Sequence, residues 1–175
     1  MGLFRGKLGP AHPITKGVMP DILKSIRVDP PRPIIRPASP EMAETAARLL
    51  YLTMQPLTAY WMGVDNADAA QRFLGKLFRG RGNLFSYEFA EVADLKGQVA
   101  GFLLDYPAAT MKRLEAPTLL QFLRIAGLRN ALRMVMRSLP LQGIAQAGPD
   151  EYFLAHLAVL PQFEGRGIGQ LLLRR

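Results

Sequence analysis

The sequence predicts a mixed α/β (α+β) domain built on a mixed sheet, because strand-like and helix-like segments alternate along it. Short apolar runs bounded by turn-forming residues are typical of strands. Between them lie segments whose apolar residues recur three and four positions apart, which is typical of helices. The length of 175 residues suits one domain, and a hydrophobic fraction of 49% is enough to form a core.

The N-terminal segment differs in composition from the rest of the chain. Residues 1–32 are rich in glycine and proline, and they carry six Lys/Arg against Asp21 and Asp29, a net charge of +4. Such a density of helix and strand breakers predicts a flexible basic leader. We therefore place the folded domain at 33–175 and expect a cytoplasmic protein, since neither a secretory signal nor an apolar run long enough to cross a membrane is present.

The first half of the domain predicts a strand, two helices and a hairpin. The apolar run 33–37 leads into a helix that we expect Pro56 to end or kink. A second helix is expected at 67–78. Two strand-like runs, 85–93 and 98–106, flank the turn-forming residues at 94–97, a pattern that favours a β-hairpin.

The segment 111–141 predicts helices that break near Gly127, with Pro117 at a helix start. It carries a net charge of +5, because its only acid is Glu115. Arg129, Arg133 and Arg137 recur every four residues beside an apolar stripe. This arginine stripe has four open interpretations: a solvated face, or contact with an acidic acceptor, with cofactor phosphates or with an anionic membrane.

A glycine-rich loop follows the strand-like run 152–159. It reads P-Q-F-E-G-R-G-I-G from Pro161 to Gly169, and a helix is expected to begin near Gly167. Glycine leaves no Cβ between the backbone and a ligand, and the first amides of a helix lack partners within it. The pattern therefore predicts a phosphate site, in which each charge-assisted hydrogen bond contributes on the order of 1.5–3 kcal/mol.

Two familiar phosphate loops do not match this one. A Walker loop places Lys and Ser or Thr after its glycines, whereas Gly169 is followed by Gln170. A dinucleotide-binding loop has a third glycine at the position of Gln170 and an acidic residue about twenty positions further on. Neither feature is present, so the ligand belongs to another class.

The loop resembles the acetyl-CoA motif of the GNAT superfamily of N-acetyltransferases. The shared pattern L-A-V-x-P-x-[FY]-[RQ]-G-x-G-I-G-x-x-L-L extends from Leu157 to Leu173. The segment Ile35–Glu44 is similar to the first strand and helix start common in that family. The resemblance implies a GNAT-like acyl-CoA N-acyltransferase fold, with a helical insertion at about 111–141.

The resemblance also implies a reaction and a set of site residues. A primary amine would attack the acetyl-CoA thioester directly, while the protein positions both reactants, removes a proton and polarises the carbonyl. Backbone groups of Leu157 and Val159 would pair with the pantetheine arm, and loop amides would bind the pyrophosphate. The full set of implied cofactor-binding residues is Leu157, Ala158, Val159, Glu164, Gly165, Arg166, Gly167, Ile168 and Gly169.

The sequence departs from the family pattern in two respects. Glu164 stands where the family usually has Arg or Gln, and its carboxylate repels a nearby pyrophosphate by about 1 kcal/mol when water screens the pair. The sequence also stops at Arg175, where the family continues with further strands and a helix. We therefore expect the N-terminal half to two-thirds of the fold, incomplete at the C-terminus, and leave open whether this chain is active.

The catalytic residues are less well defined than the cofactor site. Glu151 and His156 are weak candidates for the general base, because a solvated strand end accounts for Glu151 and a core or rim position accounts for His156. No metal is expected, since the chain has two histidines and no cysteine. The expected acceptor is a small-molecule or protein amine. Nucleic acid is not expected as a partner, and a homo-oligomer is left open. The alternative functions are an inactive CoA-binding fragment and a basic peripheral binding module.

Overall fold

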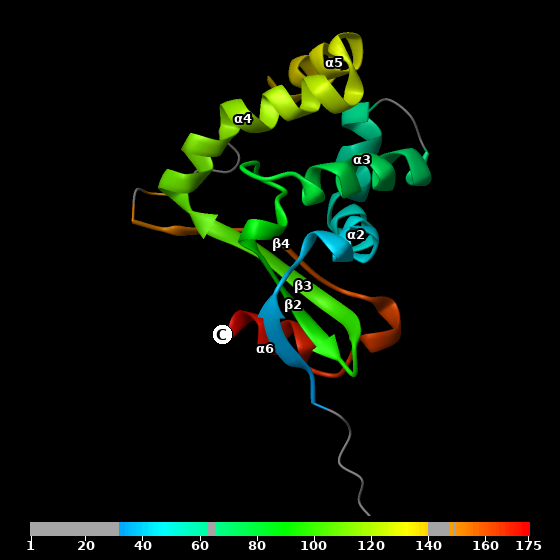
Figure 1. Cartoon of the computed structure of the whole chain (residues 1–175), viewed down its shortest axis with the longest axis vertical. Coiled ribbons are helices and arrows are strands. Elements are labelled where there is room, and N and C mark those ends of the chain that lie inside the picture. Colours follow the sequence, from blue (N-terminus) through cyan, green and yellow to red (C-terminus); the bar gives the residue numbers. More distant parts are fainter. Residues whose placement is uncertain (1–31, 63–65, 140–147, 149) are drawn as a thin grey trace, which may run out of the picture. The chain divides into compact units, whose positions relative to one another are not determined.

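Four antiparallel strands form a sheet in the order β1-β2-β3-β4 (Figure 1). This computed structural model describes residues 32–62, 66–139, 148 and 150–175. The predicted leader at 1–32 therefore lies outside the described residues, apart from Arg32. The helices and strands together confirm the α+β class. The strands are β1 (Ile34–Pro37), β2 (Ala90–Leu95), β3 (Gln98–Pro107) and β4 (Tyr152–Val159).

The β2–β3 hairpin turns where the sequence predicts it. Lys96 and Gly97 both have positive φ, of 54° and 82°, as a tight two-residue hairpin turn requires. The Asp94 carboxylate accepts a hydrogen bond from the Gly97 amide at 2.6 Å and another from Arg36 Nη2 on β1 at 2.6 Å. Strand β2 begins at Ala90 rather than at Phe85, because Ser86 caps a short 3-10 turn through the Glu88 amide.

Helix α2 (Ala43–Met62) is longer than the sequence predicts. It continues through Pro56, which we expected to end or kink it. Proline lacks the amide that would bond to the carbonyl of Leu52. Leu52 lies on an exposed part of the helix (45% exposed), so water can satisfy that carbonyl. Helix α3 (Ala67–Arg79) follows the predicted bounds closely.

The insertion forms two helices, α4 (Ala108–Ala126) and α5 (Leu128–Ser138). They separate at Gly127, whose φ of 77° confirms the predicted break. Pro117 lies inside α4 rather than at its start. The carbonyl that loses its partner belongs to Arg113, an exposed residue, so the helix tolerates the proline.

A buried asparagine fastens α4 to the loop after α3. The Asn83 side-chain amide donates to the carbonyls of Leu77 (2.9 Å) and Gly80 (3.1 Å) and to Gln121 Oε1 on α4 (2.9 Å). Its carbonyl oxygen accepts from the Phe85 amide at 2.8 Å. All of these groups are thereby satisfied inside the protein, and the two-helix insertion is held to the body of the domain.

The two faces of the sheet carry separate apolar clusters. Helices α2 and α3 pack on one face against Val92, Phe102 and Leu104. The short helix α6 (Ile168–Leu173) covers the other face through Ile168 and Leu172, which are 2% and 0% exposed. The glycine-rich loop therefore leads from the end of β4 to a helix that is anchored on the sheet.

Candidate functional site

The glycine-rich loop adopts a backbone that glycine permits and other residues resist. Gly165 and Gly167 both have a φ of 73°, in the left-handed region. A Cβ at either position would meet nothing within 4 Å, so backbone conformation rather than crowding explains these two glycines. The chain turns sharply here and enters α6 at Ile168.

The amides of this loop are free to donate. Within the part of the chain that the structure describes, the amides of Gly165, Gly167, Ile168 and Gly169 have no backbone or side-chain acceptor. The Glu164 amide differs, because it donates to the Pro161 carbonyl at 3.3 Å. Several unpaired donors on one short loop suit an anionic ligand with several oxygens, such as a phosphate or pyrophosphate.

A hollow of about 500 Å³ lies over these amides. Its lining consists of Val159 at the end of β4 and a set of loop residues: Phe163, Glu164, Gly165, Gly167, Ile168, Gly169 and Gln170. Gly169 is one of the residues that line this hollow, and a Cβ at this position would meet only the Val159 side chain, at 3.8 Å.

Strand β4 offers further backbone groups beside the hollow. Hydrogen-bonded pairs alternate along an antiparallel ladder, and the Leu160 amide donates to the Ala100 carbonyl at 2.8 Å. Counting back from Leu160 in steps of two, the backbones of Ala158 and His156 bond to β3. Those of Leu157 and Val159 point to the other edge, which pairs with no strand among the described residues.

The two charged side chains of the loop, those of Glu164 and Arg166, lie in different surroundings. The Arg166 guanidinium lies 5.4 Å from the centre of the Phe163 ring, and its Nη2 is 3.4 Å from the Gln162 carbonyl. Arg166 therefore folds back along the loop instead of reaching over the glycines. Glu164 is exposed, where water screens its charge.

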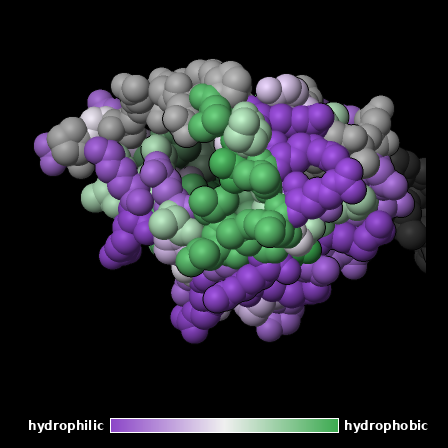
Figure 2. All heavy atoms as spheres, turned by 90° about the horizontal axis from the view of Figure 1, so that it is seen from above, coloured by the Kyte–Doolittle hydropathy of each residue, from purple (hydrophilic) through white to green (hydrophobic). Residues whose placement is uncertain are grey.

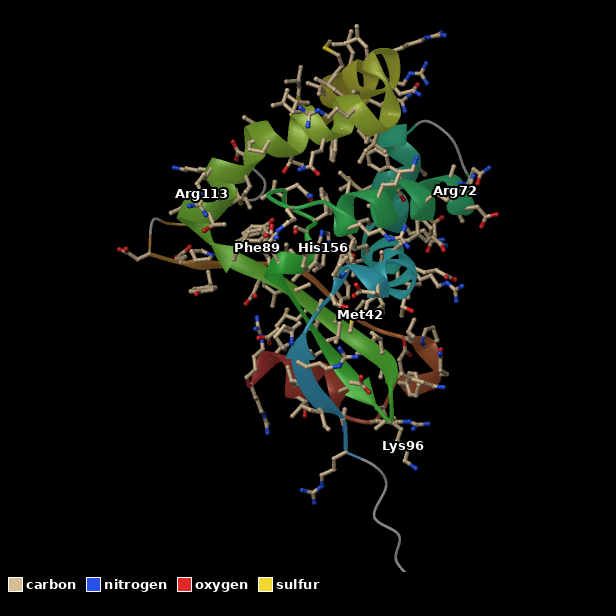
Figure 3. All side chains as sticks on the ribbon, viewed as in Figure 1. Met42, Arg72, Phe89, Lys96, Arg113 and His156 are labelled. Carbon is tan, nitrogen blue, oxygen red and sulfur yellow. The ribbon has the colours of Figure 1, made fainter. Side chains whose placement is uncertain are left out.

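His156 lies on the face of β4 that α2 covers, as Figure 3 shows. Its ring stacks on Phe85 with 5.8 Å between ring centres, and its Nδ1 is 2.9 Å from Thr53 Oγ1. Burial lowers the pKa of His156 to about 4, so the ring is neutral at pH 7. The sequence does not reveal this pairing, because Thr53 lies on a helix far away in the chain.

The proton on His156 is assigned by its neighbour. The Thr53 hydroxyl also lies 2.8 Å from the Leu50 carbonyl, which can only accept. Its single hydrogen is used there, so Nδ1 of His156 is the donor to Thr53. The Nε2 atom then carries the lone pair, which is what a proton acceptor requires.

Glu151, the other predicted candidate, closes a turn. One of its carboxylate oxygens accepts from the Gly148 amide at 2.8 Å, and its carbonyl accepts from the Ala108 amide at 3.0 Å. Among the described residues, Glu151 and His156 form no hydrogen bond or ion pair with each other. Across residues 32–62, 66–139, 148 and 150–175, no three histidine or acidic residues gather into a group able to hold a metal ion.

Comparison with known proteins identifies solved structures that share the fold of this chain. No protein-family model matches the chain, and no curated protein sequence does. Among solved structures, an acetyltransferase has a TM-score of 0.64 at 24% identity, over 81% of this chain and 70% of that chain. An N-acetyltransferase from Staphylococcus aureus Mu50 has a TM-score of 0.62 at 21% identity, over 81% and 73%. The chain therefore has the GNAT-like acetyltransferase fold that the motif at 157–173 predicts.

Proposed function

We propose that this protein is an acyl-CoA-dependent N-acetyltransferase that transfers an acetyl group from acetyl-CoA to a primary amine. The observation that carries the proposal is the loop of free amides at Gly165–Gly169, which follows the open edge of β4 in a GNAT-like fold. A pyrophosphate and a pantetheine arm are the two parts of acetyl-CoA that such a pair of features would bind.

The proposed donor site consists mainly of backbone. The amides of Gly165, Gly167, Ile168 and Gly169 would hold the pyrophosphate, and each bond to a charged oxygen contributes on the order of 1.5–3 kcal/mol. The outward groups of Leu157 and Val159 would pair with the amides of the pantetheine arm, as an added strand would. Ala158 takes part only as the residue that links them, because its backbone is committed to β3.

The proposed chemistry needs no residue that carries the acetyl group. The amine nitrogen forms a bond to the thioester carbon, the carbon–sulfur bond breaks, and the amine proton passes to a base. His156 is the better of the two candidate bases because, among the described residues, only its Nδ1 has a hydrogen-bond partner. Burial lowers its pKa to about 4, which weakens it as a base. The Glu151 carboxylate is already bonded in a turn.

The location, co-substrate, acceptor and oligomeric state of the protein are also part of the proposal. We propose a cytoplasmic enzyme that uses acetyl-CoA as co-substrate without a metal, and a small-molecule or protein amine as acceptor. A homo-oligomer is also a prediction, which sedimentation velocity would test. The acceptor class would be identified by assaying acetyl transfer to a panel of amines that includes polyamines, amino acids and lysine peptides.

The test combines binding with turnover. Acetyl-CoA is titrated calorimetrically into the full chain, and thiol release is then followed with a disulfide reagent in the presence of the amines. The absence of cysteine gives this thiol assay no background from the protein. We expect saturable binding and thiol release with at least one amine. Absence of binding at high micromolar acetyl-CoA would overturn the proposal, and binding without turnover would favour an inactive CoA-binding protein.

A further inference from the structure

Helix α5 presents three distinct faces. Ala131 and Met134 are 0% and 4% exposed and pack toward α2. Four large apolar residues lie on a second face and point into solvent. This apolar ridge consists of Leu128, Leu132, Met136 and Leu139, which are 73%, 57%, 59% and 46% exposed.

The arginine stripe forms the third face. Arg129, Arg133 and Arg137 each follow a ridge residue by one position, which places them about 100° around the helix from the ridge. Arg137 is held against α2, where it donates to the Tyr60 carbonyl and lies 5.7 Å from the Tyr60 ring centre. Helix α5 contains no acidic residue at all.

Helix α4 also carries exposed apolar residues. Leu119 and Leu120 are 39% and 54% exposed, and Arg124 is exposed beside them. Figure 2 looks onto the end of the folded unit that carries these helices, and it shows hydrophobic side chains gathered in one patch with hydrophilic ones along its border. Scattered exposed leucines need no explanation, but a contiguous patch of this kind marks an interaction site.

The positive charge around the patch distinguishes between two partners, a second copy of the chain and an anionic membrane. A second copy of the chain would bring the same unbalanced positive charge to the contact, which opposes association. An apolar ridge bordered by arginines, without acids, is the pattern of a helix that lies in the plane of an anionic membrane surface. In the described ranges no helix is both long and apolar enough to cross a bilayer, so the contact would be peripheral.

We propose that the α4–α5 insertion docks this protein on anionic lipid, with the apolar ridge in the acyl boundary and the exposed arginines of the stripe, Arg129 and Arg133, on the headgroup phosphates. This inference is independent of the proposed transferase activity. Helix α5 has eleven residues, and length is not what distinguishes an interfacial helix.

Vesicle flotation of the full chain tests the proposal. We expect binding to vesicles of 70% phosphatidylcholine and 30% phosphatidylserine, and little binding to pure phosphatidylcholine. The variant L132S/M136S changes exposed side chains only, and it should lose at least tenfold in affinity while its circular dichroism stays unchanged. The variant R129Q/R133Q should lose about fivefold per arginine. A charge-matched control, R79Q/R174Q, changes two exposed arginines on other elements and should bind like the wild type.

Each contrary outcome overturns the proposal. Equal binding by L132S/M136S and the wild type would mean that charge alone, including that of residues 1–32, attracts the chain to lipid. Equal losses in R129Q/R133Q and R79Q/R174Q would mean the same. A dimer in light scattering that dissociates in L132S/M136S, without vesicle binding by the wild type, would assign the ridge to a second copy.

Discussion

The loop at Pro161–Gly169 and the α4–α5 insertion both present positive potential, but they do so with different parts of the chain. The loop uses backbone amides, which glycines at 165 and 167 aim by their positive φ. The insertion uses arginine side chains on a regular helix beside exposed leucines. A backbone site is rigid and specific for the shape of an oxyanion, whereas a side-chain stripe suits a surface of diffuse charge.

The substitution expected to have the largest effect on stability is at Asn83, which fastens the α4–α5 insertion and lies outside the glycine-rich loop. Replacement by alanine removes the amide that joins α4 to the preceding loop and leaves buried partners without bonds, so the free energy of unfolding should fall by about 3 kcal/mol. Urea denaturation measures this change. If acetyl-CoA affinity below the unfolding transition falls as well, the loop and the insertion are not the independent units described above.

The next effect is a pH dependence of the free energy of unfolding, caused by His156 on β4. The pKa of His156 is lowered from 6.5 to about 4, so the unfolded chain binds a proton in this window and the folded chain does not. Stability should therefore be full above pH 6.5 and fall by about 2–3 kcal/mol as the pH decreases toward 4.

The check on His156 is direct, because the chain has only two histidines. Imidazole NMR signals should give one titration near 4, assigned by its absence in His156→Gln. That variant should also flatten the loss of stability between pH 6.5 and 4. A His156 signal that titrates near 6.5 would contradict the burial described for this ring.

Alanine substitution of one glycine in each region would introduce the same kind of backbone strain into the loop or into the insertion. Gly167 in the loop and Gly127 between α4 and α5 both have positive φ, 73° and 77°, with open space around them. Alanine at either position should cost about 1–2 kcal/mol of stability. Only Gly167→Ala should also weaken acetyl-CoA binding, by about tenfold, because it moves the donor amides. Equal acetyl-CoA affinities in the two variants would mean that the loop does not bind the cofactor.

The smallest expected effect is at Glu164. Its exposed carboxylate lies on the phosphate loop, so Glu164→Gln should tighten acetyl-CoA binding about two- to fivefold, and added salt should reduce the difference. Glu115→Gln on α4 changes the same charge elsewhere and should have no effect on affinity. A weaker complex in Glu164→Gln would indicate that the carboxylate contacts a donor group of the ligand.

Local signals made some of these features predictable from the sequence. The hairpin at 94–97, the break at Gly127 and the glycine loop each depend on residues that are close in the chain. The continuation of α2 through Pro56 and of α4 through Pro117 was not predictable, because it depends on whether the freed carbonyl is exposed.

Tertiary contacts account for the remaining differences. The Thr53–His156 pair and the Asn83–Gln121 bond join distant segments, and nothing near either residue in the chain signals them. The apolar stripe of α5 was visible as a pattern of leucines and methionines. That it faces solvent while Ala131 and Met134 face the core follows only from how the helices pack.

Gly169 provides the most direct test of the proposed acetyl-CoA site. Its Cβ would meet only a Val159 methyl at 3.8 Å, and both Ala and Glu are better helix formers than Gly, so neither replacement should destabilise the fold. Calorimetric titration of acetyl-CoA should show saturable binding to the wild type, a modest loss in Gly169→Ala, and a loss of at least tenfold in Gly169→Glu. Equal affinity in all three proteins, or no binding to any of them, would contradict the account.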